Sequence, residues 1–183
     1  TRGNAQPIVM SGQILPKGIV IRPIRRTDHD GLERFYAGLS PDSLDARFHA
    51  ATRGIGDRQA RSFCGPDHRH REGFVALERR RLGPDDIVGH LCLEPMDGTP
   101  DLEVAVAVAD AWQHRGIGRA LLTAAIEWAA AHQVTRLRAD VRWSNSAILG
   151  LLRSIERPVC IGAGVEGDLE AVIEVGQELP AAA

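Results

Sequence analysis

A short turn at residues 113–118, QHRGIG, has the residue types and spacing of an anion-binding site. It opens a long helix, and the first amides of a helix have no intrahelical partner and attract anions together with the helix dipole. Gly116 and Gly118 lack a Cβ, so a diphosphate could lie directly against the backbone. Nearby positive or polar side chains are those of His114, Arg115 and Arg119.

The same turn fits a second interpretation, an ordinary strand-to-helix connection that begins with glycine. A third glycine at the spacing of the dinucleotide fingerprint is missing, and no Gly-Lys-Ser/Thr follows, so neither of those phosphate-binding motifs is present. The spacing of the turn therefore leaves both interpretations open.

The strand that leads into the turn, residues 103–109, divides its residues between two faces. Its valines lie on one face, and its alanines share the other face with Glu103. A buried central strand against which a helix packs closely would have this pattern. A strand whose small residues leave room for a ligand would have it too.

The elements that must position this stretch follow from periodicity and turn residues along the chain. Pro23 places the first strand near an edge of the sheet or at a bulge, and Ser40 with Pro41 starts a helix as N-cap and first residue. Strands are predicted at 19–24, 74–77, 87–93, 103–109, 136–141, 158–161 and 169–175. Helices are predicted at 29–39, 41–49, about 57–63, from the turn to about 131, and 145–155. The order predicts an α+β fold with a mixed sheet.

Composition bounds the class of protein. The chain has 183 residues, 44% of them apolar, with 22 basic and 24 acidic side chains and a net charge of −2, which argues against a nucleic-acid partner. No stretch approaches the roughly 18 apolar residues of a membrane span, and the start does not resemble a signal peptide. We expect one domain over 18–177, a flexible N-terminal arm or cloning remnant at 1–17, and a disordered tail at 178–183.

The cysteines and two loop histidines give weaker signals. Cys64, Cys92 and Cys160 are an odd number without a CxxC pair, which indicates a reducing compartment and a cytoplasmic protein. We expect all three to be buried, unreactive residues. His68 and His70 have no third ligand at a fixed spacing, so we interpret them as part of a solvated loop and predict no metal site.

Three segments in register resemble the GCN5-related N-acetyltransferase (GNAT) family. The pattern Gln-x-x-Gly-x-Gly at 113–118, after a Val-x-Val strand and before an amphipathic helix, is similar to the family's acetyl-CoA signature. Asn145 begins NSAILGLL, similar to the start of the family's fourth helix, and residues 21–28, IRPIRRTD, resemble its first strand and helix. The resemblance implies a layered, GNAT-like mixed sheet of about seven mostly antiparallel strands with flanking helices. It also implies a splay between the fourth and fifth strands.

The resemblance also implies acetyl-CoA as co-substrate and assigns roles to residues. The amides from about residue 115 to 120 would hold the pyrophosphate: Arg115, Gly116, Ile117, Gly118, Arg119 and Ala120. The main chain of Val106 and Val108 would pair with the pantetheine arm, and Asn145 would bind near the pantetheine or thioester. Gln113 and His114 would lie in the turn beside the phosphates.

Glu103 is the predicted catalytic residue. An amine such as lysine lies roughly 3.4 units below its pKa at neutral pH, so its deprotonation costs about 4.6 kcal/mol, which a general base relieves. The family often has a glutamate at this place, and burial beside Ala105 and Ala107 would raise its pKa. The alternative is a strand-end carboxylate that is solvated or paired with arginine. A backbone amide near Val106 is expected to meet the oxyanion.

The sequence departs from the family at the proton donor to the leaving thiolate. Relatives often carry a tyrosine where this chain has Leu152, and its one tyrosine, Tyr36, lies in the first predicted helix. Solvent or Ser144 would then supply the proton. Glu156-Arg157 also replaces the usual Gly-aromatic pair after that helix.

The acceptor side allows several activities. Residues 21–28, 39–43 and 47–48 resemble the bacterial branch that acetylates protein lysines, and a small amine or amino acid is the alternative acceptor. A non-catalytic acyl-CoA sensor is a further alternative because the tyrosine is missing. We expect direct attack of a primary amine in a ternary complex, by a monomer or homodimer.

Overall fold

The computed structural model has seven strands and the helices that cover them. It describes residues 15–176, and for Glu166 it describes the backbone alone. The strands are β1 (Ile19–Pro23), β2 (Glu72–Glu78), β3 (Asp86–Pro95), β4 (Leu102–Val108), β5 (Arg136–Val141), β6 (Val159–Ala163) and β7 (Leu169–Glu174). The helices are α1 (His29–Ala37), α2 (Pro41–Phe48), α3 (Asp57–Phe63), α4 (Ile117–Ala131) and α5 (Ser146–Ser154). Short 3-10 turns lie at Arg26–Asp28, Asp110–Trp112 and Val165–Gly167.

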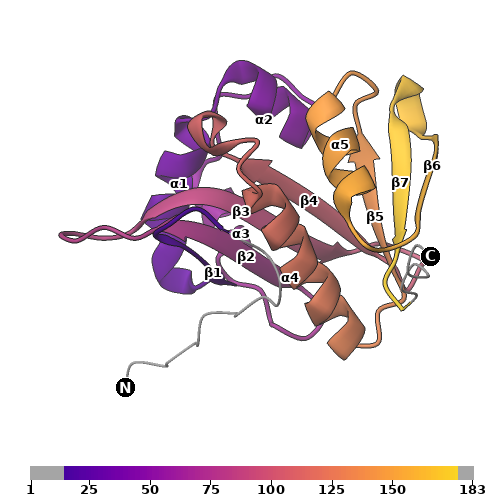
Figure 1. Ribbon diagram of the computed structural model, residues 1–183, viewed down its shortest axis with the longest axis horizontal. Coiled ribbons are helices and arrows are strands. Elements are labelled where there is room, and N and C mark those ends of the chain that lie inside the picture. Colours follow the sequence, from indigo (N-terminus) through magenta and orange to yellow (C-terminus); the bar gives the residue numbers. More distant parts are fainter. Residues whose placement is uncertain (1–14, 177–183) are drawn as a thin grey trace.

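The sheet has the order β1-β2-β3-β4-β5-β7-β6, with β1 at an edge, which is one of the two positions that Pro23 allowed. All neighbours are antiparallel except β4 and β5, which run parallel and pair only at Leu102–Leu137 and Glu103–Arg138. Beyond Glu103 the two strands diverge (Figure 1). The predicted GNAT-like α+β sheet and its splay are therefore confirmed.

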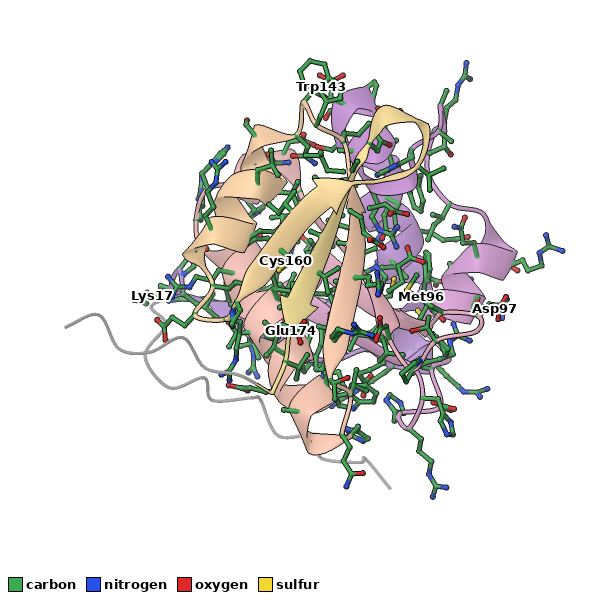
Figure 2. The ribbon with its side chains drawn as sticks, turned by 90° about the vertical axis from the view of Figure 1, so that its right-hand side faces the viewer. Lys17, Met96, Asp97, Trp143, Cys160 and Glu174 are labelled. Carbon is green, nitrogen blue, oxygen red and sulfur yellow. The ribbon has the colours of Figure 1, made fainter. Side chains whose placement is uncertain are left out.

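Helices cover both faces of the sheet and create two cores (Figures 1 and 2). The larger core joins α4 and α5 to the face that carries Val104 and Leu137. The smaller core joins α1, α2 and α3 to the opposite face, which carries Ala107. The alternation of valine and alanine in β4 thus serves two cores, and it places β4 in the middle of the layers.

Local sequence signals explain where α2 starts and stops. Ser40 accepts a hydrogen bond from the amide of Ser43 at 3.2 Å, and Pro41 occupies the first turn, where its missing N–H costs nothing. His49 ends the helix in the left-handed conformation, with φ at 53°. These signals orient the end of α2 toward the splay.

A buried carboxylate fixes the closed end of the splay. Asp101 is 1% exposed and accepts hydrogen bonds from Arg136 Nε at 3.0 Å and Arg138 Nε at 2.5 Å. Both arginines belong to β5, and Asp101 directly precedes β4. The pairing of β4 with β5 is held at this point, and the strands separate from there on.

The predicted arm and tail fall mostly outside the described residues. Within the part of the arm that is described, Leu15 packs against the larger core. None of the helices between residues 15 and 176 combines the length and apolarity needed to span a membrane.

Candidate active site

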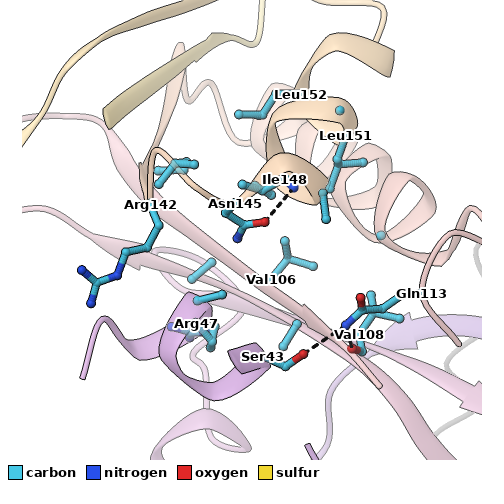
Figure 3. A pocket seen from close by; sticks show the side chains of 18 of the residues that line it. Ser43, Arg47, Val106, Val108, Gln113, Arg142, Asn145, Ile148, Leu151 and Leu152 are labelled. Atoms are coloured by element: carbon cyan, nitrogen blue, oxygen red, sulfur yellow. Dashed lines mark hydrogen bonds between the residues drawn. The ribbon is translucent and has the colours of Figure 1, made fainter. Parts of the chain in front are cut away.

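A cavity of about 1170 Å³ opens where β4 and β5 diverge. Its walls are β4, the end of β5, the turn before α4, and the facing helices α2 and α5 (Figure 3). Among the residues that line it are Glu103, Val106, Val108, Gln113, His114, Gly116, Gly118, Arg119 and Asn145. The fold therefore brings most of the predicted site residues to one hollow.

The edge of β4 that faces β5 has no strand partner past Glu103. Its backbone groups there are available to a ligand that lies along the strand, because buried backbone groups require hydrogen-bond partners. Val106 and Val108 are half-buried on this stretch and line the cavity. An extended amide-containing chain, such as pantetheine, has the hydrogen-bonding groups to fill this position.

The turn presents bare amides at the start of α4. Gly116 occupies the N-cap position with φ at 81°, a left-handed conformation that glycine adopts without strain, and no side chain caps the helix. The first hydrogen bond of the helix runs from the Ala120 amide to the Gly116 carbonyl at 3.0 Å. The preceding amides are thus free for an anion.

The side chains around the turn are held by their neighbours. A Cβ on Gly118 would lie 3.4 Å from a Leu151 methyl and 3.7 Å from a Val108 methyl, so a large side chain there would fill the space between α5 and β4. Arg119 pairs with Glu156 at 3.2 Å. Arg115 lies 5.1 Å over the Trp112 ring, and both Arg115 and His114 are exposed.

Gln113 ties the turn to α2 and β4. Its amide donates to Ser43 Oγ at 3.1 Å and to the Val108 carbonyl at 3.2 Å (Figure 3). The Ser43 hydroxyl donates to Asp110 at 2.8 Å, and Asp110 also accepts bonds from the Ser40 amide and hydroxyl. This network positions α2 against the turn. The sequence offered Ser40 only as a helix cap, and nothing in it pointed to Asp110.

Asp110 remains charged within this network. Desolvation works to raise the pKa of the Asp110 carboxyl, but the hydrogen bonds from Ser40 and Ser43 outweigh it and lower that pKa below its ordinary value. The carboxylate can therefore accept all of these bonds at neutral pH.

Asn145 has a structural role that is compatible with ligand binding. It is the N-cap of α5, and its Oδ1 accepts a bond from the Ile148 amide at 3.1 Å. The cap uses the oxygen and leaves the amide N–H groups of Asn145 on the cavity side, across from α2 (Figure 3). The predicted helix start is confirmed.

Glu103 lines the cavity but is exposed. The expected burial beside Ala105 and Ala107 is wrong, because α1–α3 cover β4 at Ala107 and do not extend over its beginning. Pairing with arginine, the structural alternative, is not observed among the described residues. Glu94, which lies opposite Glu103 on β3, forms an ion pair with Arg71 at 2.6 Å. Glu103 is thus an unpaired, solvated carboxylate at the mouth of the splay.

At residue 152, where relatives often carry the proton-donating tyrosine, this chain has a leucine. Leu152 is 2% exposed and packs in the larger core. Tyr36 is fully buried under the sheet, with its hydroxyl 2.8 Å from His90 Nδ1. Ser144 is exposed and lines the cavity.

The acceptor half of the cavity, between α2 and the end of β5, is bridged by ion pairs. Arg142, just past β5, lies 3.2 Å from Asp45 of α2 and 3.8 Å from Asp168. His49 lies 3.0 Å from the same Asp168. These contacts connect α2 to the turn between β6 and β7, across the splay from the glycine turn.

The remaining sequence candidates lie elsewhere. Cys64 and Cys92 are buried as expected, but Cys160 is exposed, because β6 is the outer strand of the sheet and no helix covers it there. His68 and His70 are exposed and pair with Glu72 and Asp67, as a solvated loop would.

Comparison with known proteins agrees with this geometry. No curated protein matches the sequence. Among solved structures, the GNAT domain of S. lividans PAT is 21% identical, with a TM-score of 0.74 over 85% of this chain and 90% of that one. The structure of yncA from Salmonella typhimurium with its cofactor acetyl-CoA is 19% identical, with a TM-score of 0.66 over 91% and 97%. The ribosomal-protein-S5-alanine acetyltransferase from Vibrio fischeri is 13% identical, with a TM-score of 0.67 over 91% and 98%.

The family model provides the assignment. The model of the acetyltransferase (GNAT) family matches residues 32–154, which is more than half of the 183 residues. This range contains the glycine turn, the splayed pair β4 and β5, and Asn145. The chain therefore belongs to the acetyltransferase (GNAT) family.

Proposed function

We propose that the protein transfers an acetyl group from acetyl-CoA to a primary amine by direct attack in a ternary complex. The observation that carries this proposal is the unpaired edge of β4 leading to the uncapped glycine turn. The first feature suits an extended amide chain, and the second suits a pyrophosphate. Bound acetyl-CoA supplies the acetyl group as a thioester.

In this proposal three parts of the chain bind different parts of acetyl-CoA. The amides of residues 115–119 hold the pyrophosphate, with Gln113 and His114 beside it; the amide of Ala120, which the sequence also suggested, already donates to the Gly116 carbonyl. The main chain of Val106 and Val108 holds the pantetheine arm. Asn145 donates its amide N–H to the same arm near the thioester, which its capped side chain can do without leaving the helix.

Glu103 is the proposed general base. It lines the cavity and no described cation neutralises it, so it can accept a proton from the incoming amine, directly or through water. The new bond joins the amine nitrogen to the acetyl carbon as the carbon–sulfur bond breaks. The proton from the amine goes to Glu103, and solvent or Ser144 protonates the thiolate. A backbone amide near Val106 stabilises the developing negative oxygen.

The test is the rate of thiol release from acetyl-CoA with an amine panel, comparing wild type with Glu103→Gln. We expect kcat to fall by about 10²–10⁴-fold, the range for loss of a general base, while the acetyl-CoA dissociation constant stays the same. Asp97→Asn, an exposed carboxylate in the β3–β4 turn, is the control. An unchanged kcat across pH would reject Glu103 as the base.

A second candidate is an acyl-CoA sensor without turnover. Leu152 in place of the usual tyrosine favours it, because no acid is in place to protonate the leaving thiolate. Acetyl-CoA binding without acetyl transfer to any amine or lysate protein would support the sensor. Turnover on any amine would exclude it.

Three primary-amine acceptors fit the proposed reaction: a protein lysine, a small amine and a free amino acid. They differ in whether a carboxylate accompanies the amine. The charges in the acceptor half of the cavity bear on this choice.

A further inference from the structure

Arg47, in the last turn of α2, occupies an unusual place in the acceptor half of the cavity. Its side chain is half-buried and lines the cavity (Figure 3). The guanidinium lies 4.8 Å from the centre of the Phe48 ring and 5.7 Å from that of Phe63, and NH2 donates to Cys92 Sγ at 3.1 Å. The buried Nε atom has no hydrogen-bond partner among residues 15–176.

Arg47 also lacks a counter-charge that other half-buried arginines have. Arg71 lies 2.6 Å from Glu94, and Arg142 lies 3.2 Å from Asp45. Within the described part of the chain, no carboxylate lies within the 4.0 Å of an ion pair with Arg47. The cation is therefore enclosed by two aromatic rings and a sulfur atom, and the nearest carboxylate that acts on it, Glu103, lies beyond ion-pair distance.

The titratable groups that touch Arg47 are neutral at physiological pH. Burial raises the pKa of the Cys92 thiol and that of the Tyr36 hydroxyl, so both stay protonated. Burial, together with the charge of Arg47, lowers the pKa of His90 to about 3, so this histidine is uncharged. The cluster carries one net positive charge.

An unbalanced, partly desolvated guanidinium is costly unless an anion meets it. Its planar fork matches a carboxylate in two parallel hydrogen bonds. Because Arg47 lines the cavity, a ligand can reach it. We propose that Arg47 binds a carboxylate of the acceptor, which makes the acceptor a small amino-carboxylate such as a free amino acid. This inference rests on the proposed acetyl transfer to an amine.

The strand register agrees with an acceptor of that size. Cys92, which receives the Arg47 bond, lies opposite Ala105 on β4. Glu103 is two residues away on the same face, or about 7 Å along the strand. A molecule with its amine a few bonds from its carboxylate can contact Arg47 and still present the amine beside Glu103 at the splay.

The experiment measures thiol release from acetyl-CoA with free amino acids, each compared with its own carboxamide. For the best substrate we expect kcat/KM to be about 10- to 100-fold higher for the acid, the range for a hydrogen-bonded charged group. Arg47→Met keeps the apolar stem and should bring the ratio of kcat/KM for acid to kcat/KM for carboxamide close to one. Arg26→Met, at an exposed position outside the cavity, should keep the preference.

The outcomes separate this inference from the proposed function. Equal use of acid and carboxamide by the wild type would overturn the role of Arg47 and leave acetyl transfer intact; efficient acetylation of a lysine within an uncharged peptide would do the same. If Arg47→Met does not fold, Arg47→Lys should show a reduced preference, because it loses the fork. If no amine is acetylated, the proposed function fails. Calorimetric binding of amino acids to the CoA complex then decides: binding that Arg47→Lys weakens supports the carboxylate site, and no binding overturns it.

Discussion

The ion pairs of Asp101 with Arg136 and Arg138, here called the Asp101 clamp, hold the start of β4 against β5 and so determine where the splay begins. The variant Asp101→Asn tests this role. The carboxylate is buried, and Arg136 and Arg138 of β5 donate to its two oxygens at 3.0 Å and 2.5 Å. Asparagine has nearly the same size but no charge, and its amide nitrogen would face one of the guanidinium groups. The substitution therefore removes the attraction without opening a cavity.

The magnitude follows from the exposure of the partners. Breaking a fully buried ion pair costs about 3–5 kcal/mol, and breaking an exposed one about 0–1 kcal/mol. The Asp101 side chain is 0% exposed, but those of Arg136 and Arg138 are 39% and 25% exposed and stay partly solvated. We therefore expect the free energy of unfolding to fall by about 2–3 kcal/mol, between these limits. For a domain of this size the melting temperature would fall by roughly 4–12 °C.

The pH dependence gives the prediction a second measurable side. Burial acts to raise the pKa of Asp101, but the hydrogen bonds from Arg138 and Arg136 lower it below its ordinary value. A depressed pKa in the folded state contributes stability that is present above the unfolded pKa of about 3.9. This contribution is lost as pH falls through the folded pKa. The difference in stability between wild type and Asp101→Asn should be constant near neutral pH and shrink in acid.

The assay is urea unfolding followed by circular dichroism at a series of pH values. Asp97→Asn, the same change at an exposed site in the β3–β4 turn, is the control and should alter stability by less than about 0.5 kcal/mol. A loss below 1 kcal/mol for Asp101→Asn, or a difference that grows as the pH falls, would refute the clamp as described.

Two further predictions concern the cofactor side of the cavity. Gly118→Trp should weaken CoA binding by more than about 100-fold in calorimetry, because the indole would fill the space between Leu151 and Val108; intact binding would exclude the pyrophosphate position, and the melting temperature checks folding. Asn145→Ala should lower stability by about 1 kcal/mol through loss of the cap, and it should also weaken acetyl-CoA binding. Asn145→Ser retains a capping oxygen and lacks the amide donor, so it should weaken binding while nearly preserving stability. If Asn145→Ser binds acetyl-CoA like the wild type, Asn145 is a cap only.

Local signals in the sequence were enough to predict the elements. Ser40 and Pro41 start α2 because cap and proline act within one turn, and Asn145 starts α5 for the same reason. The strands were predicted because alternation has a period of two along the chain, with ends that differ by a few residues, such as 74–77 against Glu72–Glu78. The glycine turn was recognisable because the positive φ of Gly116 needs glycine at that position.

These local signals did not predict which side chains of a strand are exposed, because exposure depends on which elements cover the strand. Alternation placed Glu103 on the face of Ala105 and Ala107, but only the packing of α1–α3 shows that this face is open at Glu103. Cys160 is exposed for the same reason, at the uncovered edge of the sheet. An apolar residue in a predicted strand is buried only if another element packs over it, and the strand pattern does not indicate whether one does.

The sequence by itself thus determined the order of elements, the glycine turn and the start of α5 near Asn145, because each depends on residues a few positions apart. Only the tertiary structure brought Asp110 to Ser40 and Ser43, and Arg47 to Phe63 and Cys92. These contacts join residues far apart in the chain, and no periodicity encodes them. The glycine turn was predictable because residues close together in the chain form it, whereas the contacts of Arg47 join α2 to α3 and β3 and were not predictable.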